Sequence, residues 1–151
     1  MTTLVIDELK SSLEQEFRLD RQERYSIGAF IPYLYMHNSP LGTFKITLSK
    51  NGNAINFLET FTSADIKLAL NTSDNYAHVF YPIIPSKPIQ LEKGLYKITL
   101  SSVSGYTFKN NSYLGWIRQH ENVQPDRSYY LNDESELAYS MRIKVFTEGI
   151  L

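Results

Sequence analysis

The 151-residue chain contains no cysteine, no excess charge of either sign and no long apolar run. Without cysteine it has no disulfide, thiolate metal site or cysteine nucleophile. Its 15 basic and 16 acidic residues give a net charge of −1, so we expect no binding to nucleic acid. No segment approaches the roughly 18 apolar residues of a membrane span, and we expect no membrane insertion. Residues 1–8 lack the basic and apolar regions of a signal peptide, so none is predicted.

Several short segments show apolar and polar residues in alternation. The apolar members are Phe44, Ile46 and Leu48 in one segment, Tyr96, Ile98 and Leu100 in another, and Tyr139, Met141, Ile143 and Val145 in a third. A period of two places successive side chains on opposite faces of a strand. We also interpret residues 13–19 as a strand, although Leu9, Leu13 and Phe17 would fit one face of a helix.

Turn and cap residues separate these segments. Asn51-Gly52 is a strong hairpin signal, because both residues tolerate a positive φ angle. Residues 62–71 are expected to form one or two helical turns, with Thr62 or Ser63 as the N-cap and Asp65 in the first turn. Residues 76–84 are interpreted as a strand, residues 86–93 as a connector and residues 120–136 as a polar loop.

The pattern predicts an all-β fold, a jelly-roll-like antiparallel β-sandwich of about eight strands with one short helical turn. An eight-stranded barrel is the alternative architecture. We divide the chain into an N-terminal arm or short strand at residues 1–12, the sandwich at residues 13–147 and a C-terminal tail at residues 148–151.

A series of motifs follows in a characteristic order: residues 13–19 (LEQEFRL), 31–36 (IPYLYM), 40–48 (PLGTFKITL), 63–66 (SADI), 91–100 (LEKGLYKITL) and 112–116 (SYLGW). Together they resemble the jelly-roll modules of phage virion proteins and of extracellular bacterial proteins. Such sandwiches are similar to carbohydrate-binding and galactose-binding-like domains. The resemblance spans roughly residues 13–146 and consists of turns, strand starts and core aromatics, with no catalytic residue.

The resemblance, with no signal peptide predicted, implies a non-enzymatic structural or adhesion module of a virion, assembled in the host cytoplasm. A capsid decoration, fibre or tail-associated protein would act through protein–protein contacts, and its partners would be a shell or tail protein and further copies of the chain. The alternative is a stand-alone carbohydrate-binding, lectin-like domain whose partner is a surface glycan. The sequence has no G-x-S-x-G motif, and we predict neither catalytic residues nor a cofactor.

Two clusters mix aromatic rings with polar groups, as sugar-binding sites do. The candidate ligand-binding residues are Tyr106, Phe108, Asn111, Tyr129 and Tyr130. Rings would stack on the C–H faces of a sugar, and the amide would bind its hydroxyl groups. The competing interpretation is that these loop aromatics cover one end of the sandwich.

Metal binding is not predicted. The three histidines, His37, His78 and His120, are far apart in the sequence and form no H-x-x-x-H motif. A structural calcium ion remains an open alternative at Asp126, Asp133 and Glu134, although EF-hand spacing is absent.

Two strand segments carry aromatic or aliphatic groups on both faces. They are Tyr33-Leu34-Tyr35 and Val79-Phe80-Tyr81. One face of each strand must be core, and the other meets a second layer, a subunit or water. An apolar patch that meets water would favour a partner.

Overall fold

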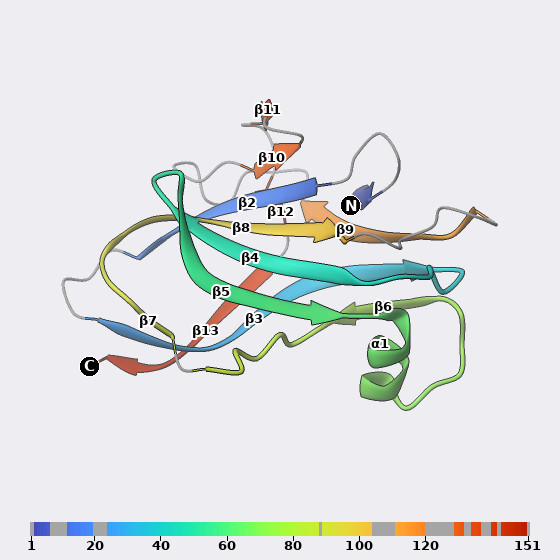
Figure 1. Ribbon diagram of the computed structural model, residues 1–151. Helices are drawn as coiled ribbons and strands as arrows, with labels where there is room; N and C mark the ends of the chain where they lie inside the picture. The colour runs from blue at the N-terminus through green and yellow to red at the C-terminus, as the bar shows by residue number, and fades with distance from the viewer. Residues whose placement is uncertain are drawn as a thin grey trace.

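In the computed structural model, the chain folds into two antiparallel β-sheets that pack against each other, with one short helix at the side (Figure 1). The structure describes residues 2–6, 12–19, 24–87, 89–103, 111–119, 129–131, 134–136, 140–141 and 143–150. Within these ranges, eight strands have five or more residues and five strands are shorter. The predicted all-β sandwich with one short helix is confirmed.

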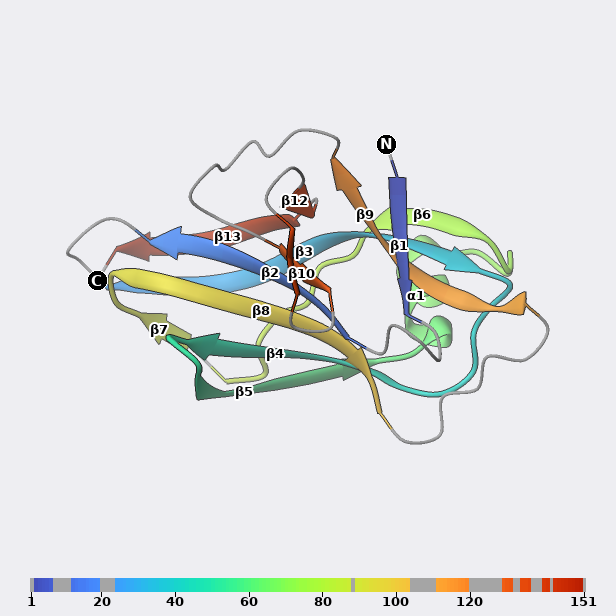
Figure 2. The same cartoon turned by 90° about the horizontal axis from the view of Figure 1, so that it is seen from above.

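The first sheet has seven strands: β1 (Thr2–Ile6), β3 (Tyr25–His37), β6 (Ala77–Phe80), β7 (Ile89–Leu91), β9 (Tyr113–Gln119), β12 (Ser140–Met141) and β13 (Ile143–Ile150). Its main path is β1-β9-β3-β13. The long strand β3 organises it, pairing with β7 and β13 over its first part and with β6 and β9 over its last part. Figure 2 shows β1 alongside β9 at one end and β13 at the other.

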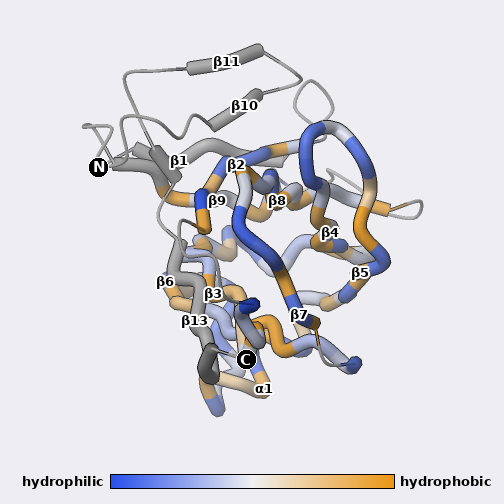
Figure 3. The backbone as a smooth tube through the Cα atoms, turned by 90° about the vertical axis from the view of Figure 1, so that its left-hand side faces the viewer, coloured by the Kyte–Doolittle hydropathy of each residue, from blue (hydrophilic) through white to orange (hydrophobic). Residues whose placement is uncertain are grey.

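The second sheet has six strands: β2 (Ser12–Leu19), β4 (Phe44–Lys50), β5 (Asn53–Phe61), β8 (Gly94–Ser102), β10 (Tyr129–Leu131) and β11 (Glu134–Glu136). Its order is β11-β10-β2-β8-β4-β5, so β5 forms one end. Figure 3 shows β2, β8, β4 and β5 following one another in this layer, with β3 in the other layer.

The hydrophobic core lies between the two sheets. The apolar members of the alternating patterns in β4 and β8 are buried as predicted: Phe44, Ile46, Leu48, Tyr96, Ile98 and Leu100. In β2 the buried residues are Leu13, Gln15, Phe17 and Leu19. Phe17 packs against Phe30 of the facing sheet with ring centroids 6.0 Å apart, and against Tyr96 at 5.5 Å. Residues 140–141 and 143–150 also form strands, but the side chains of the third predicted pattern lie outside the described part of the chain.

The predicted turn and helix are present. Asn51 and Gly52 have φ angles of 51° and 81° and connect β4 to β5. The helix α1 (Ser63–Leu70) begins after Thr62, whose hydroxyl oxygen accepts a hydrogen bond from the backbone N–H of Asp65. The Asp65 carboxylate accepts one from the backbone N–H of Thr62 at 2.8 Å, which completes a capping box. No helix in the described ranges has the length and apolarity to cross a membrane.

Several expected boundaries differ from the structure. The predicted connector at residues 86–93 contains the strand β7, and the predicted loop at residues 120–136 contains β10 and β11. The strand expected over residues 76–84 is shorter, because only Ala77–Phe80 form β6. Thr2–Ile6 form β1, which pairs with β9 and agrees with the short strand allowed for residues 1–12. β13 continues to Ile150, beyond the expected end of the sandwich at residue 147.

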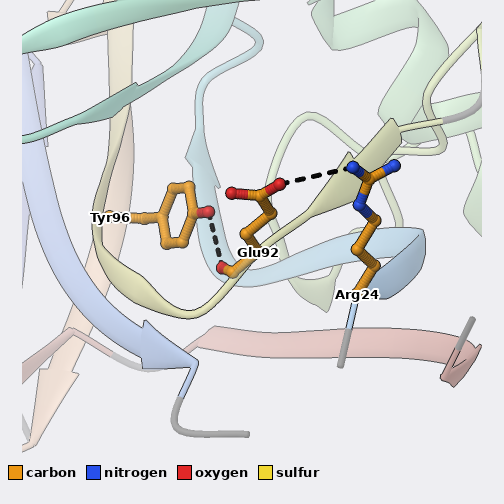
Figure 4. A network of polar contacts seen from close by, with 3 residues as sticks. All are labelled: Arg24, Glu92 and Tyr96. Atoms are coloured by element: carbon orange, nitrogen blue, oxygen red, sulfur yellow. Dashed lines mark hydrogen bonds and ion pairs between the residues drawn. The ribbon is translucent and has the colours of Figure 1, made fainter. Parts of the chain in front are cut away.

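The turn between β7 and β8 is held by Glu92 (Figure 4). Its backbone carbonyl accepts a hydrogen bond of 2.7 Å from the Tyr96 hydroxyl, and its carboxylate lies 3.5 Å from the Arg24 guanidinium. The Tyr96 ring is buried, which raises the pKa of its hydroxyl above the ordinary value. The core ring of β8 is therefore anchored to the turn that precedes its strand.

Candidate functional site

A row of seven aromatic and histidine rings lies on the outer face of the seven-stranded sheet. We call it the aromatic stripe; its members are Tyr33, Tyr35, His37, Tyr76, His78, Phe80 and Tyr113. Rings occupy every second position at the end of β3 and again over residues 76–80, which are β6 and the residue before it. Alternate residues of a strand share one face, so the rings of each strand lie on one side of the sheet. The alternate residues Leu34, Met36, Val79 and Leu114 are buried in the core.

Strand register brings the rings into contact across the sheet. Three pairs lie directly opposite each other: Tyr33 with Phe80, Tyr35 with His78, and His37 with Tyr113. Their ring centroids are 4.3, 4.5 and 4.4 Å apart. Further contacts connect the three pairs and Tyr76 without a break: Tyr33 with His78, Tyr35 with Tyr113 and His37 with Tyr76, at 6.3, 5.9 and 5.0 Å. Cross-strand aromatic pairs of this kind stabilise a sheet by roughly 0.2–1 kcal/mol each.

The rings stand upright on the sheet. The planes of the three opposite pairs are within 2–22° of parallel, so each ring covers the face of its partner across the strands. Because this stacking direction runs within the sheet, the pairs turn ring edges outward. Tyr76 differs, since it meets His37 edge-on at 86° and is 53% exposed.

Polar atoms gather at the end of the stripe where β3 ends. The Tyr35 hydroxyl lies 3.0 Å from Nδ1 of His37, and the Asn111 amide nitrogen lies 3.5 Å from Nε2 of the same ring. Burial, and secondarily the neighbouring Tyr35, raises the pKa of the Tyr113 hydroxyl. The stripe therefore combines apolar ring edges with hydroxyl, imidazole and amide groups.

Of the five predicted ligand-binding residues, the structure describes the side chain of Asn111 and the backbones of Tyr129 and Tyr130. Asn111 is exposed and contacts the stripe through His37. The backbones of Tyr129 and Tyr130 are in β10, in the other sheet, where they pair with Gln15 and Glu14 of β2, and their side chains lie outside the described part. Tyr106 and Phe108 also lie outside it. Only Asn111 is therefore seen at the stripe.

Two histidines that are far apart in the sequence meet in the stripe. His37 and His78 both contact the Tyr35 ring, with centroids 5.6 and 4.5 Å away. Within the described ranges, no three histidine or carboxylate side chains are grouped so that they could hold a metal ion. Two candidates for a calcium site, Asp126 and Asp133, lie outside these ranges, as do His120 and the side chain of Glu134.

Sequence reasoning recognised two of the strands but not the stripe as a unit. Tyr33 and Phe80 were identified as residues of two-faced strands, whereas His37, Tyr76 and His78 were not assigned to any surface. The sequence does contain a pattern that indicates two aromatic strand faces, because rings recur at positions 33, 35 and 37 and again at positions 76, 78 and 80. No protein-family model and no curated protein matches this chain.

Proposed function

We propose that the chain is a non-enzymatic structural or adhesion module of a virion that acts by docking its aromatic stripe on a protein partner. The observation that carries this proposal is the continuous row of seven half-buried or exposed rings on an outer sheet face. Tyrosine is enriched at protein interfaces because its ring is apolar and its hydroxyl is polar. The virion role is supported by the motif order described above.

The stripe suits a contact role because its side chains are already ordered. Tyr35 packs against three other members of the stripe and directs its hydroxyl at His37. Rings held in this way lose little conformational freedom when a partner binds, which favours affinity.

Ring orientation favours a protein partner over a sugar. A sugar stacks its C–H face on an open ring face, but each ring of the three opposite pairs has one face covered by its partner. Ring edges and hydroxyl groups instead suit the carbonyl oxygens and aromatic faces that a protein surface presents.

Carbohydrate binding is the second candidate, and one corner of the stripe favours it. Tyr76 is not part of a parallel pair and is half exposed, and it contacts His37, which also has the Asn111 amide beside it. An open ring beside an amide could hold a single sugar unit.

The two candidates are separated by sedimentation with virus particles. We expect the tagged chain, produced during infection by the phage that encodes it, to co-sediment with gradient-purified particles and to resist elution by free sugars. The double variant Tyr33→Ser/Phe80→Ser should remain in the soluble fraction. The matched control is Thr47→Ala/Thr99→Ala, which removes an opposite pair from the other sheet's outer face and should still co-sediment.

Absence of the wild-type chain from the particles would contradict the virion role. Release of the chain by free sugar, together with glycan-array binding that is lost in Tyr76→Ala, would establish the second candidate instead.

A further inference from the structure

A groove separates the short helix α1 from the loop that follows β3. Its walls are residues 39–43 on one side and Thr62, Ser63, Ala64 and Lys67 on the other, and its volume is about 420 Å³. Figure 1 shows α1 directly after β5, at one end of the two sheets. No residue of these walls belongs to the aromatic stripe, so the groove is a separate surface of the molecule.

Hydrogen bonds and one buried side chain hold the walls of the groove in place. The buried Ser63 donates a hydrogen bond of 2.6 Å from its hydroxyl to the Pro40 carbonyl, which joins the helix to the loop. Asn75, in the segment after the helix, accepts hydrogen bonds from the backbone N–H and the hydroxyl of Ser39 at 2.9 and 2.8 Å. Ile66 is fully buried and anchors α1 in the core. A groove with fixed walls loses little conformational freedom when a ligand binds.

Lys67 supplies a positive charge in a fixed position. Its Nζ donates a hydrogen bond of 3.0 Å to Oδ1 of Asn75, the same oxygen that accepts the Ser39 hydroxyl. Within the described residues, the Lys67 ammonium forms no ion pair with a carboxylate. Asp65, the one acidic residue of α1, accepts hydrogen bonds from the backbone N–H and the hydroxyl of Thr62 at 2.8 and 3.1 Å. Its carboxylate is therefore used at the helix start, and Lys67 is left for an external anion.

The groove also has aliphatic walls that are open to solvent. Leu41 in the loop is 66% exposed, and Ala64 on the helix is exposed as well. Leu68 lies one turn after Ala64 on the same face of the helix and is 81% exposed. Of the eight residues of α1, only Ser63 and Ile66 are buried. The groove therefore combines two aliphatic walls with one cation.

We propose that this groove binds an acidic peptide segment of a partner protein. An aspartate or glutamate carboxylate of the segment pairs with Lys67, and a neighbouring aliphatic side chain packs against Leu41 and Ala64. The charge of the groove decides the class of ligand, because one lysine matches the single negative charge of a carboxylate. A free phosphate ion would leave the aliphatic walls uncovered, and an anionic membrane surface attracts clusters of lysine and arginine rather than one lysine.

Selection from a random library of short linear peptides on the immobilised full chain tests this proposal. We expect the enriched peptides to contain aspartate or glutamate next to leucine, isoleucine or valine. One enriched peptide is then synthesised together with its amide analogue, in which asparagine or glutamine replaces the acidic residue, and both are titrated into the isotope-labelled chain. The NMR signals that shift should belong to residues 39–43 and 62–67, and the acidic peptide should bind about threefold or more tightly than the analogue.

Variants of the chain separate the charge of the groove from its walls. Lys67→Met keeps the length of the side chain and removes its charge, so it should lower the affinity for the acidic peptide to that for the amide analogue and leave the analogue unaffected. The matched control is Lys87→Met, which removes an exposed cation outside the groove and should change neither affinity. Leu41→Ser should weaken the binding of both peptides, whereas Leu58→Ser, at a 58% exposed leucine of β5, should not.

The groove and the aromatic stripe can be tested independently. The variant Tyr33→Ser/Phe80→Ser should bind the acidic peptide as the wild-type chain does, so failure of the stripe to dock would leave the groove proposal intact. Four results would each overturn the groove proposal: no enrichment of any peptide, enrichment of peptides without an acidic residue, NMR shifts outside the groove, or equal binding of the acidic peptide by wild type and Lys67→Met.

Discussion

The two sheets have the same kind of inner face and opposite kinds of outer face. Inside, both present aliphatic and aromatic side chains to one core. Outside, the seven-stranded sheet presents the aromatic stripe, whereas the six-stranded sheet presents mostly charged and hydroxyl side chains from β2, β4 and β8: Glu14, Glu16, Arg18, Lys45, Thr47, Ser49, Lys97, Thr99 and Ser101. The fold requires only the inner pattern, so the sheets can differ in the chemistry of their outer faces.

The polar face shows what an outer sheet face needs for stability alone. Lys97 and Glu14 form an ion pair at 3.3 Å across β8 and β2, and the rest of the face is hydroxyl groups and scattered charges. The pair is largely buried at its acidic end, because the Glu14 side chain is 12% exposed. Because this face is sufficient for a stable sheet, the rings of the stripe are more than the sheet requires.

The largest effect is expected from removing a ring of the inner face. Tyr96→Ala removes a buried ring that stacks on Phe17, and it should lower the free energy of unfolding by about 3–5 kcal/mol. Thr99→Ala, on the same strand but facing outward, should cost no more than about 1 kcal/mol. Urea denaturation of both variants measures the difference, and equal losses would mean that the inner and outer faces of β8 are wrongly assigned.

An intermediate effect is expected in the stripe. Tyr35→Ala removes ring contacts with His37, His78 and Tyr113 and should cost about 1–2 kcal/mol in the same urea experiment. Thr47→Ala on the polar face should cost less than about 0.5 kcal/mol. Tyr35→Phe keeps the ring and removes the hydroxyl that lies near His37. If Tyr35→Ala were as mild as Thr47→Ala, the stripe would add nothing to the stability of its sheet.

The smallest effect at neutral pH is expected from tyrosine ionisation. Burial raises the pKa of Tyr81, Tyr96 and Tyr113 in the folded chain above the ordinary value of 10.0. Their contribution to stability is therefore complete below pH 10 and is lost as the pH rises through the folded-state pKa values. Unfolding free energies measured from pH 7 to 11 should be flat at first and then fall. Tyr113→Phe and Tyr96→Phe should each reduce the alkaline fall, and an unchanged profile in both would exclude this origin.

Local sequence patterns predicted the fold well where each element is specified by its own residues. Phe44, Ile46 and Leu48 alternate in a strand, Asn51-Gly52 turns it, and Thr62 with Asp65 starts the helix. The strand β7 could not be predicted in this way. It has three residues, Ile89–Leu91, and proline residues at positions 85 and 88 indicate a connector.

The stripe depends on information that local patterns do not contain. Ring alternation on two strands indicates two aromatic faces, but not that Tyr35 lies opposite His78 or that His37 lies opposite Tyr113. These registers join residues 43 and 76 positions apart, and they are fixed by the packing of the whole sandwich. The loop aromatics were preferred as ligand-binding residues because clusters that are contiguous in the sequence are easier to recognise.

The strand order also has a consequence for synthesis on the ribosome. β1, β2 and β3 have no partners among one another; β1 pairs with β9, β2 with β8 and β10, and β3 with strands from β6 onward. When the hairpin of β4 and β5 has left the ribosome, the residues that pair with the apolar strand β3, which all lie beyond position 76, have not yet been made. Pairing over such distances is slow and leaves apolar strands exposed. We therefore expect the nascent chain to need a chaperone until its last third has been made.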